Sequence, residues 1–138
     1  SMILLTKVDK NMNYYIEAFK RYVDFNGRSS RSEYWYFILF NLIALLVLMI
    51  IDLAIGTYDK QSNLGLLSGL YQLAVFLPAL ALAVRRLHDT DRSGWFVLLV
   101  LLPIVGTIVY IVLMVLPSDS KKNKYGSVPK KLIVVREK

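Results

Sequence analysis

The chain has 138 residues, a net charge of +7 and a hydrophobic fraction of 56%. The absence of cysteine excludes disulfides, thiolate metal sites and a cysteine nucleophile, and a single histidine excludes a multi-histidine metal site within one chain. The hydrophobic fraction is higher than in ordinary soluble domains, and the charges lie almost entirely outside the apolar stretches. This distribution leaves no room for a separate soluble domain.

Three long apolar runs organise the sequence, at 34–55, 64–84 and 95–116. Each has 21 or 22 residues, and about 20 residues of helix suffice to cross a hydrocarbon core of roughly 30 Å. Because the first run begins at residue 34 and lacks a small-residue cleavage site, we expect an uncleaved span and no signal peptide. We therefore predict an all-α integral membrane protein with three transmembrane helices. Its membrane domain, 34–116, lies between an N-terminal segment, 1–33, and a basic C-terminal tail, 117–138.

Residues 14–25 are predicted to form a short N-terminal amphipathic helix before the first span. Charged side chains recur at helical spacing on one narrow face, and aromatic and aliphatic side chains cover the rest. Such a helix suits the headgroup region of a membrane, although packing onto the protein's own loops fits the same pattern. Asn26 and Gly27 end the helix, and Ser30 with Glu33 forms a capping-box pattern that starts the first span.

The apolar runs hold few polar positions. Asn41 and Asp52 are eleven residues apart, which places them within about 20° of each other on one helical face. They form a polar stripe toward the bundle interior, or Asp52 simply lies near the end of the span and reaches the interface. Gly65 and Gly69 have a spacing that allows helices to approach closely, but their place at the edge of a run favours coincidence.

The third run contains Pro103 and Gly106, so it either spans the membrane or breaks into a re-entrant hairpin. Ser93 is its expected N-cap. Three full spans leave 9 basic residues on one side and 8 on the other, whereas a re-entrant third run divides them 16 to 1. The positive-inside rule therefore cannot orient a three-span protein. We predict three spans, because 22 apolar residues fit a full crossing and a re-entrant turn must be shielded from lipid.

The loop after the second run, RRLHDTDRSGW, is too dense in charge for a simple connector. If the second helix continues past the membrane, Arg85, His88, Asp89 and Arg92 share a face, and Asp89 can pair with Arg85 or Arg92. Guanidinium groups match phosphate geometry, so we predict a ligand-binding site for lipid headgroups at Arg85, Arg86, His88, Asp89 and Arg92. Arg86 is the least obviously paired and should be the most available. The structural alternative is a positive-inside anchor whose charges satisfy each other.

Three segments together resemble the bacterial membrane family called domain of unknown function 805. They are the charged loop with its flanking apolar runs, residues 25–35 (FNGRSSRSEYW) and residues 123–129 (NKYGSVP). The residues that carry the resemblance are Arg28, Arg31, Glu33, Trp35, Leu87, Ser93, Gly94, Trp95, Asn123, Tyr125, Gly126 and Pro129. The resemblance covers roughly residues 14–129 and implies a bacterial inner (plasma) membrane protein, with no established reaction. Asp91 departs from the pattern, which has a small residue such as Gly there, and its charge argues against a tight turn.

These features favour a small multi-pass membrane protein that binds or organises anionic lipid or a membrane partner at the bilayer surface. One alternative is an oligomeric transporter or channel component, since three spans cannot easily enclose a pore alone. The other is a lipid-headgroup enzyme, but no catalytic residue is predicted, because the His88-Asp89 pair has no nucleophile at a recognisable spacing. No cofactor or metal is implied. The expected partners are lipids with anionic headgroups, further copies of the chain or another membrane protein. Nucleic acid is excluded because no aromatic residues interleave the basic ones.

Overall fold

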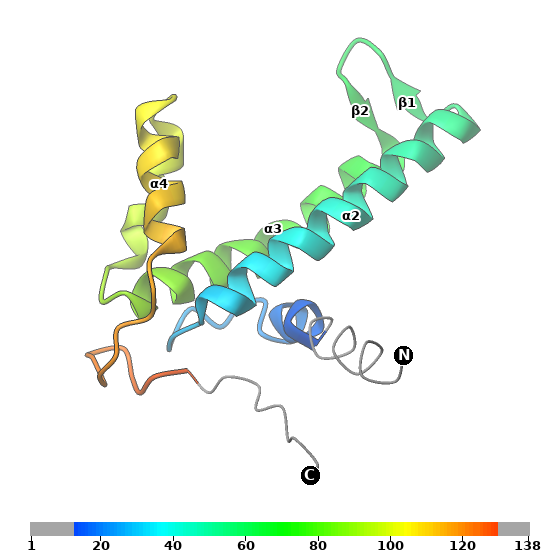
Figure 1. Ribbon diagram of the computed structural model, residues 1–138. Helices are drawn as coiled ribbons and strands as arrows, with labels where there is room; N and C mark the ends of the chain where they lie inside the picture. The colour runs from blue at the N-terminus through cyan, green and yellow to red at the C-terminus, as the bar shows by residue number, and fades with distance from the viewer. Residues whose placement is uncertain (1–12, 130–138) are drawn as a thin grey trace, which may run out of the picture.

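The computed structural model describes residues 13–129, so the ends of the predicted N-terminal segment and of the basic tail, 1–12 and 130–138, lie outside the described residues. Figure 1 shows the elements in chain order. They are a helix at 13–20, α2 (Arg31–Ile55), β1 (Tyr58–Asp59), β2 (Leu64–Gly65), α3 (Leu66–Asp89), the 3-10 helix η1 (Gly94–Leu101) and α4 (Val105–Val115). The irregular segment 116–129 follows α4.

The helices α2 and α3 form an antiparallel pair joined by the β1–β2 hairpin (Figure 1). With 25 and 24 residues, both are long and apolar enough to cross a membrane. The Ser30 hydroxyl caps α2 by accepting a 3.2 Å hydrogen bond from the N–H of Glu33, as the capping-box pattern predicts. α3 continues through Pro78 and past residue 84 to Asp89, so the first five residues of the charged loop, 85–89, belong to this helix.

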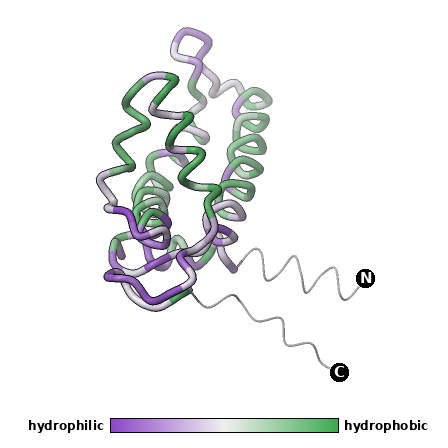
Figure 2. The backbone as a smooth tube through the Cα atoms, turned by 60° about the vertical axis from the view of Figure 1, so that its left-hand side comes forward, coloured by the Kyte–Doolittle hydropathy of each residue, from purple (hydrophilic) through white to green (hydrophobic). Residues whose placement is uncertain are grey.

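The surface of α2 is apolar and open along most of its length. Tyr34, Phe37 and Asp52 are its buried residues, whereas Leu46 and Ile50 are about three-fifths exposed. Isolated exposed leucines are ordinary in soluble proteins, but a continuous apolar helix surface requires a partner or a hydrocarbon solvent. Figure 2 shows hydrophobic helices between hydrophilic stretches at the two ends of the α2–α3 pair, the pattern of a membrane protein.

The third apolar run does not form a third spanning helix. It is divided into η1, with 8 residues, and α4, with 11, so each piece is only about 16 Å long. Between them Ile104 has a φ of 65°, and Pro103 has no N–H to continue a helix. At Gly106 a Cβ would lie 2.0 Å from the carbonyl oxygen of Leu99, so the glycine allows the two pieces to pack closely. The predicted third transmembrane helix is therefore not confirmed, and the run has the hairpin form that was its alternative.

Both ends of the η1–α4 hairpin lie at the same end of the α2–α3 pair. The indole N–H of Trp35, in the second turn of α2, donates to the carbonyl of Met114 at 3.0 Å. At the other end of the hairpin Gly94 is so close to Val84 that a Cβ would be 2.7 Å from a valine methyl. The buried core is also here, with Phe37 and Leu82 packed in one cluster with Met114. Away from this end α4 diverges from α2 and α3 (Figure 1).

The N-terminal helix ends earlier than predicted, because residues 21–23 form turns instead of continuing the helix to residue 25. Its aromatic face contacts the spanning pair: the ring of Tyr15 stacks on Phe37, with centroids 5.5 Å apart, and its hydroxyl lies 2.6 Å from that of Tyr71. Ala18 is buried in the same contact, whereas Ile16 is 44% exposed. Packing against the protein accounts for Tyr15, Ala18 and Phe19, whereas Tyr22 and Val23 are exposed. A location in the headgroup region is not confirmed.

The two polar residues of the first span both face α3. The amide oxygen of Asn41 accepts a 2.8 Å hydrogen bond from the Tyr71 hydroxyl. The Asp52 carboxylate is fully buried and accepts the backbone N–H groups of Leu67 and Ser68 at 3.0 and 2.9 Å. Asp52 thus satisfies donors of the first turn of α3, which Gly65 cannot cap with a side chain. It is turned toward the neighbouring helix, not toward the membrane interface.

Candidate functional site

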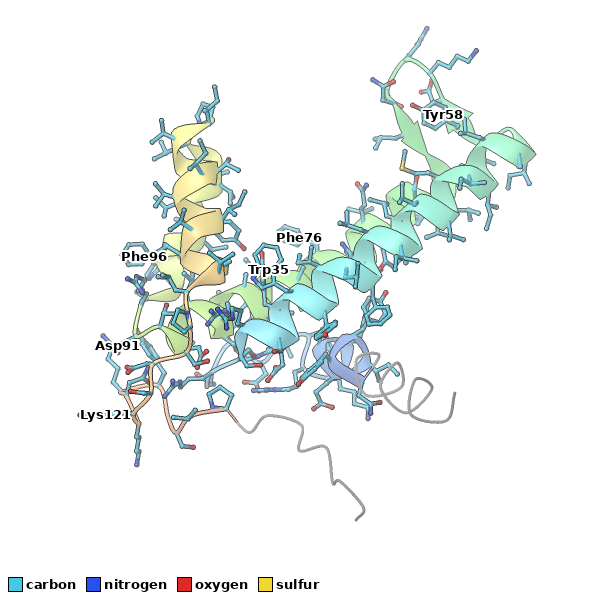
Figure 3. The ribbon with its side chains drawn as sticks, viewed as in Figure 1. Trp35, Tyr58, Phe76, Asp91, Phe96 and Lys121 are labelled. Carbon is cyan, nitrogen blue, oxygen red and sulfur yellow. The ribbon has the colours of Figure 1, made fainter. Side chains whose placement is uncertain are left out.

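The three segments that carry the family resemblance meet at one end of the molecule. We call this region the polar cap and define it as residues 24–31, 85–92 and 115–127. Figure 3 shows Asp91 and Lys121 at this end and Tyr58 of the β-hairpin at the opposite end. The charged side chains at the centre of the cap are buried, although they come from the most hydrophilic part of the sequence.

Asp89, at the last residue of α3, is the centre of the polar cap and is fully buried. One carboxylate oxygen accepts from Nε of Arg28 at 3.0 Å, and the other accepts from Nη1 of Arg86 at 2.9 Å. The hydroxyl of Ser118 donates to the second oxygen. The backbone carbonyl of Asp89 accepts the N–H of Asp119 at 2.8 Å. One residue therefore connects the segment before α2, the end of α3 and the segment after α4.

Arg28 uses all five of its N–H donors inside the polar cap. Two bonds go to the side chain and the carbonyl of Asp89, and three go to the carbonyls of Asp119, Lys121 and Gly126, at 2.6 to 3.2 Å. A guanidinium group has no further donor. Two arginines share one aspartate, so one positive charge is left without a counter-ion. The carbonyl oxygens carry partial negative charge and offset it.

The other two buried arginines are also bonded within the protein. Arg86 is fully buried and donates to the carbonyls of Met114 and Leu116 as well as to Asp89. Arg85 is 1% exposed and donates to the hydroxyl of Ser29 at 2.9 Å. The same guanidinium donates to the carbonyls of Arg21 and Asp24, at 3.1 and 2.5 Å. The expectation that Arg86 is the least paired arginine is wrong: it forms an ion pair and holds the C-terminal end of α4.

Asp24 lies at the edge of the polar cap and forms a 2.8 Å ion pair with Arg21. Partial burial acts to raise the pKa of its carboxyl, but the hydrogen bonds from Arg21 and from the N–H of Asn26, with the nearby positive charges, lower the pKa below its usual value. Asp24 is therefore ionised at neutral pH.

His88 and Tyr125 form a stacked pair at the surface of the polar cap. Their rings are 3.9 Å apart and nearly parallel, at 2°. Nδ1 of His88 lies 2.9 Å from the carbonyl of Gly27, which requires the proton on Nδ1 and leaves Nε2 free for another group. The side chain of Asn123 holds this arrangement by donating to the carbonyl of His88 at 3.0 Å and accepting the N–H of Tyr125 at 2.9 Å.

The predicted pairing of Asp89 with Arg85 or Arg92 is wrong. α3 ends at Asp89, so Arg92 is no longer on the helix, and its guanidinium donates to the carbonyl of Thr90 at 3.1 Å. The chain turns through Asp91, whose φ of 58° is in the left-handed region. A tight turn is therefore present, although we predicted that the charge of Asp91 would argue against one. A short polar side chain tolerates this left-handed conformation.

The family-motif residues have several different roles. Arg28, Asn123, Tyr125 and Gly126 belong to the network, Arg31 donates to Val115, and Trp35 donates to Met114. Ser93 caps η1, and Glu33 donates its N–H to the Ser30 hydroxyl. Leu87 is buried in the core and Gly94 contacts Val84, whereas Trp95 is 77% exposed. Pro129 is the last described residue. Ser29 and Ser118 bond to the central charges but were not among the predicted site residues. Ser29 lies within a quoted motif, whereas no sequence signal marks Ser118.

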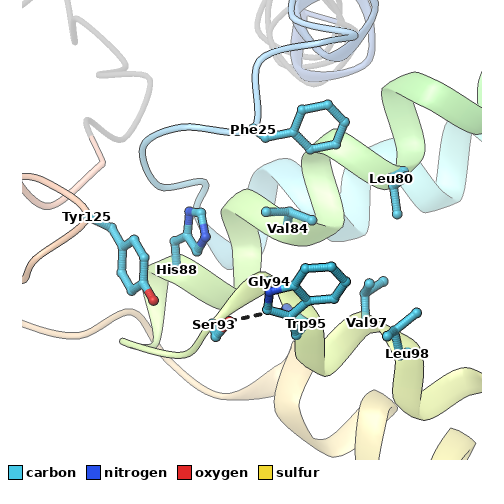
Figure 4. Close-up of a pocket in the computed structure, with 10 residues that line it drawn as sticks. All are labelled: Phe25, Leu80, Val84, His88, Ser93, Gly94, Trp95, Val97, Leu98 and Tyr125. Carbon is cyan, nitrogen blue, oxygen red and sulfur yellow. Dashed lines mark hydrogen bonds between the residues drawn. The ribbon is translucent and has the colours of Figure 1, made fainter.

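A pocket of about 530 Å³ lies beside the polar cap, between α3 and η1 (Figure 4). Its walls are mainly apolar and its polar lining is at the cap. The lining residues are Phe25, Leu80, Val84, His88, Ser93, Gly94, Trp95, Val97, Leu98 and Tyr125. Within residues 13–129, no three His, Asp or Glu side chains are placed to hold a metal ion. The pocket is thus suited to a ligand with a long apolar part and a small polar end.

The family model for the protein of unknown function DUF805 matches residues 22–127, which include all three segments of the polar cap. The chain belongs to the DUF805 family. The inner membrane protein YhaI of Escherichia coli strain K12 is 46% identical over 119 residues, which are 86% of this chain and 97% of the relative. The inner membrane protein YhaH of the same strain is 42% identical over 119 residues, 86% of this chain and 98% of the relative. No solved structure matches the chain significantly.

Family membership agrees with the two apolar helices. This DUF805 protein is an integral protein of the bacterial inner membrane, as the resemblance implied. The family carries no established activity, so its function has to be inferred from the polar cap and the pocket.

Proposed function

We propose that this DUF805 protein binds anionic lipid headgroups at the cytoplasmic surface of the inner membrane, through the cations exposed around its polar cap. The distribution of basic residues carries the proposal. Within residues 13–129, ten of the eleven Lys and Arg residues lie at the cap end of the α2–α3 pair, and Lys60 alone lies at the β-hairpin end. Basic flanking residues favour the cytoplasmic side, where anionic lipids give the membrane a negative surface potential.

The proposal includes the path of the chain through the membrane. α2 and α3 cross it, and the η1–α4 hairpin enters and leaves on the cytoplasmic side. The hydrogen bonds from Trp35 and Arg31 to the last residues of α4 support this path, because they join the exit of the hairpin to the start of α2. The backbone of a re-entrant turn has to be shielded from lipid, and the packing of η1 on α4 and α3 provides part of that shield.

Exposed cations, not the buried arginines, are assigned to headgroup binding. Arg85 and Arg86 have their donors engaged within the protein, so the lipid site first expected there moves to the rim of the polar cap. Lys121, Lys122 and Lys124 are exposed on the segment after α4. Near an anionic surface each such charge contributes roughly 1 kcal/mol of attraction.

The test compares a rim variant with a control at the other end of the molecule. The protein is assembled into nanodiscs from a neutral lipid mixed with a fixed fraction of anionic lipid, and the lipid composition of filled and empty discs is compared. Wild-type protein should enrich the anionic lipid, and the enrichment should fall in K121Q/K122Q/K124Q and in high salt, which screens exposed charges. K60Q should behave as wild type. Equal enrichment by the triple variant and wild type would refute the proposal.

A further inference from the structure

The pocket between α3 and η1 has two chemically different ends. Leu80 and Val84 of the spanning helix α3 form one wall, and Leu98 of η1 contributes to the other. Figure 4 shows Leu80 and Val84 on the α3 side and Trp95 on the η1 side, with His88 and Tyr125 together at one end. A ligand that fills the pocket therefore has an apolar part along α3 and a polar group at the polar cap.

The polar end offers two hydroxyl donors and a ring nitrogen. Nδ1–H of His88 donates to the carbonyl of Gly27, so Nε2 of the neutral imidazole can only accept a hydrogen bond. Its stacked partner Tyr125 brings a hydroxyl to the same end, and Ser93, which accepts from the N–H of Trp95, retains its own hydroxyl proton. The hydroxyl groups of Tyr125 and Ser93 can both donate to a phosphate oxygen.

We propose that this pocket binds one phospholipid of the bilayer, with an acyl chain between α3 and η1 and the phosphate beside the hydroxyl groups of Tyr125 and Ser93. Three features favour this occupant. The volume of about 530 Å³ is within the range of about 300–1,000 Å³ for small-ligand sites. The apolar walls belong to segments with the composition of membrane spans, and the polar end lies at the polar cap, where the headgroup region would be. The proposal deepens the proposed function and rests on it only for the position of the polar cap at the membrane surface.

A phospholipid accounts for the exposure of Trp95 better than a soluble ligand does. The indole is 77% exposed although it belongs to the pocket lining. Tryptophan is favoured at the boundary between acyl chains and headgroups, because its ring is apolar and its N–H is polar. The pocket is partly open to its surroundings and is not an enclosed cavity.

The first experiment fills the pocket. Leu80→Phe and Leu98→Trp enlarge its walls, and Leu73→Phe is the control, because Leu73 lies on α3 outside the pocket and is 76% exposed. Each protein is extracted from membranes in mild detergent, and native mass spectrometry counts the phospholipids retained. Wild type and Leu73→Phe should retain one, and retention should fall on the order of tenfold in the filling variants, which corresponds to about 1.4 kcal/mol. Equal retention by filling variants that melt at the wild-type temperature would overturn the proposal, as would a second copy or a peptide occupying the pocket instead.

The second experiment does not depend on the folding of the filling variants. Delipidated wild type is titrated with a phospholipid whose acyl chain is brominated, and tryptophan fluorescence is followed. Quenching should saturate at one equivalent, and the saturating part should vanish in Trp95→Phe, which leaves Trp35 as the chain's other tryptophan. Quenching that rises without saturation would overturn the proposal.

The third experiment tests the phosphate contact by removing the Tyr125 hydroxyl. Tyr125→Phe keeps the ring that stacks on His88 but removes its hydroxyl, so retention of a phospholipid should fall severalfold while retention of a diacylglycerol is unchanged. An equal effect on both ligands would exclude the phosphate contact. Failure of this proposal is distinguishable from failure of the proposed function, since the lysine variants change the preference for anionic lipid and the pocket variants change a single bound lipid of either charge.

Discussion

The backbone of Gly65 lies against the carboxylate of Asp52 so closely that a Cβ on the glycine would be 1.9 Å from Oδ2. This contact allows Asp52, on the first spanning helix, to bind the N–H groups at the start of the second. The spacing of Gly65 and Gly69 is a coincidence, as we predict from its place at the edge of an apolar run. Gly65 admits a carboxylate and not a neighbouring helix backbone, and nothing lies within 4 Å of a Cβ at Gly69.

Gly65→Ala should lower the free energy of unfolding by about 1–3 kcal/mol, because the added methyl group displaces the Asp52 carboxylate. Gly69→Ala is the matched control: nothing lies within 4 Å of a Cβ at that position, and alanine is favoured over glycine inside a helix by about 0.5–1 kcal/mol. Thermal melting in detergent should therefore move in opposite directions for the two variants. The same shift in both would show that the Asp52 contact contributes nothing.

Asp89→Ala should destabilise the protein by about 3–5 kcal/mol, because it leaves Arg28 and Arg86 buried without their shared anion. Asp119→Ala is the control, since Asp119 contributes to the polar cap through its backbone groups. Melting temperature and proteolysis of the segment after α4 are the measurements. A wild-type melting temperature for Asp89→Ala would mean that the ion pairs do not hold the polar cap.

Asp91→Gly should stabilise the protein by up to about 1 kcal/mol, because the residue has a φ of 58° that glycine adopts without a steric cost. Asp91→Ala should have the opposite effect, since alanine disfavours the left-handed region. The two variants remove the same exposed charge, so melting experiments separate conformation from electrostatics. Equal shifts in both would assign the effect to charge.

The absence of cysteine makes the topology directly testable. Ser62→Cys in the β-hairpin loop should react in intact cells with a maleimide that cannot cross the inner membrane, and Ser127→Cys at the polar cap should react only after the membrane is opened. Both positions are exposed, so access to the reagent is decided by the side of the membrane. Labelling of Ser127→Cys in intact cells would contradict a cytoplasmic cap.

The lengths of the first two apolar runs predicted α2 and α3 well, because a spanning helix is determined by composition over about 20 residues. The same measure was misleading for the third run, where composition is equally apolar but Pro103 and the positive φ of Ile104 interrupt the helix. Length alone cannot separate one crossing from two short pieces that turn back. The 16-to-1 division of basic residues favours the hairpin, and it was a better guide than length.

The segments that form the polar cap could be identified from sequence, but their pairing could not. Helical spacing identifies partners three or four residues apart, and it includes the Arg86–Asp89 pair only as one of several choices. Arg28 is 61 residues from Asp89, and its remaining acceptors are backbone carbonyls that any residue type provides. Arg85 and Arg86 were expected to bind lipid but are buried and bonded within the protein. The sequence of a charge-dense loop does not reveal whether the loop folds inward.

The bonds of Arg28 set an order for the completion of the fold during synthesis. Its two bonds to Asp89 can form as soon as α3 exists, but the other three need carbonyls between residues 119 and 126. At about 5–20 residues per second, the ribosome adds those residues seconds after Arg28 itself. Until those residues are made, Arg28 lacks three of the five acceptors that it has in the folded protein. Residues 119–126, which follow α4, therefore complete the bonding of an arginine that precedes both spanning helices.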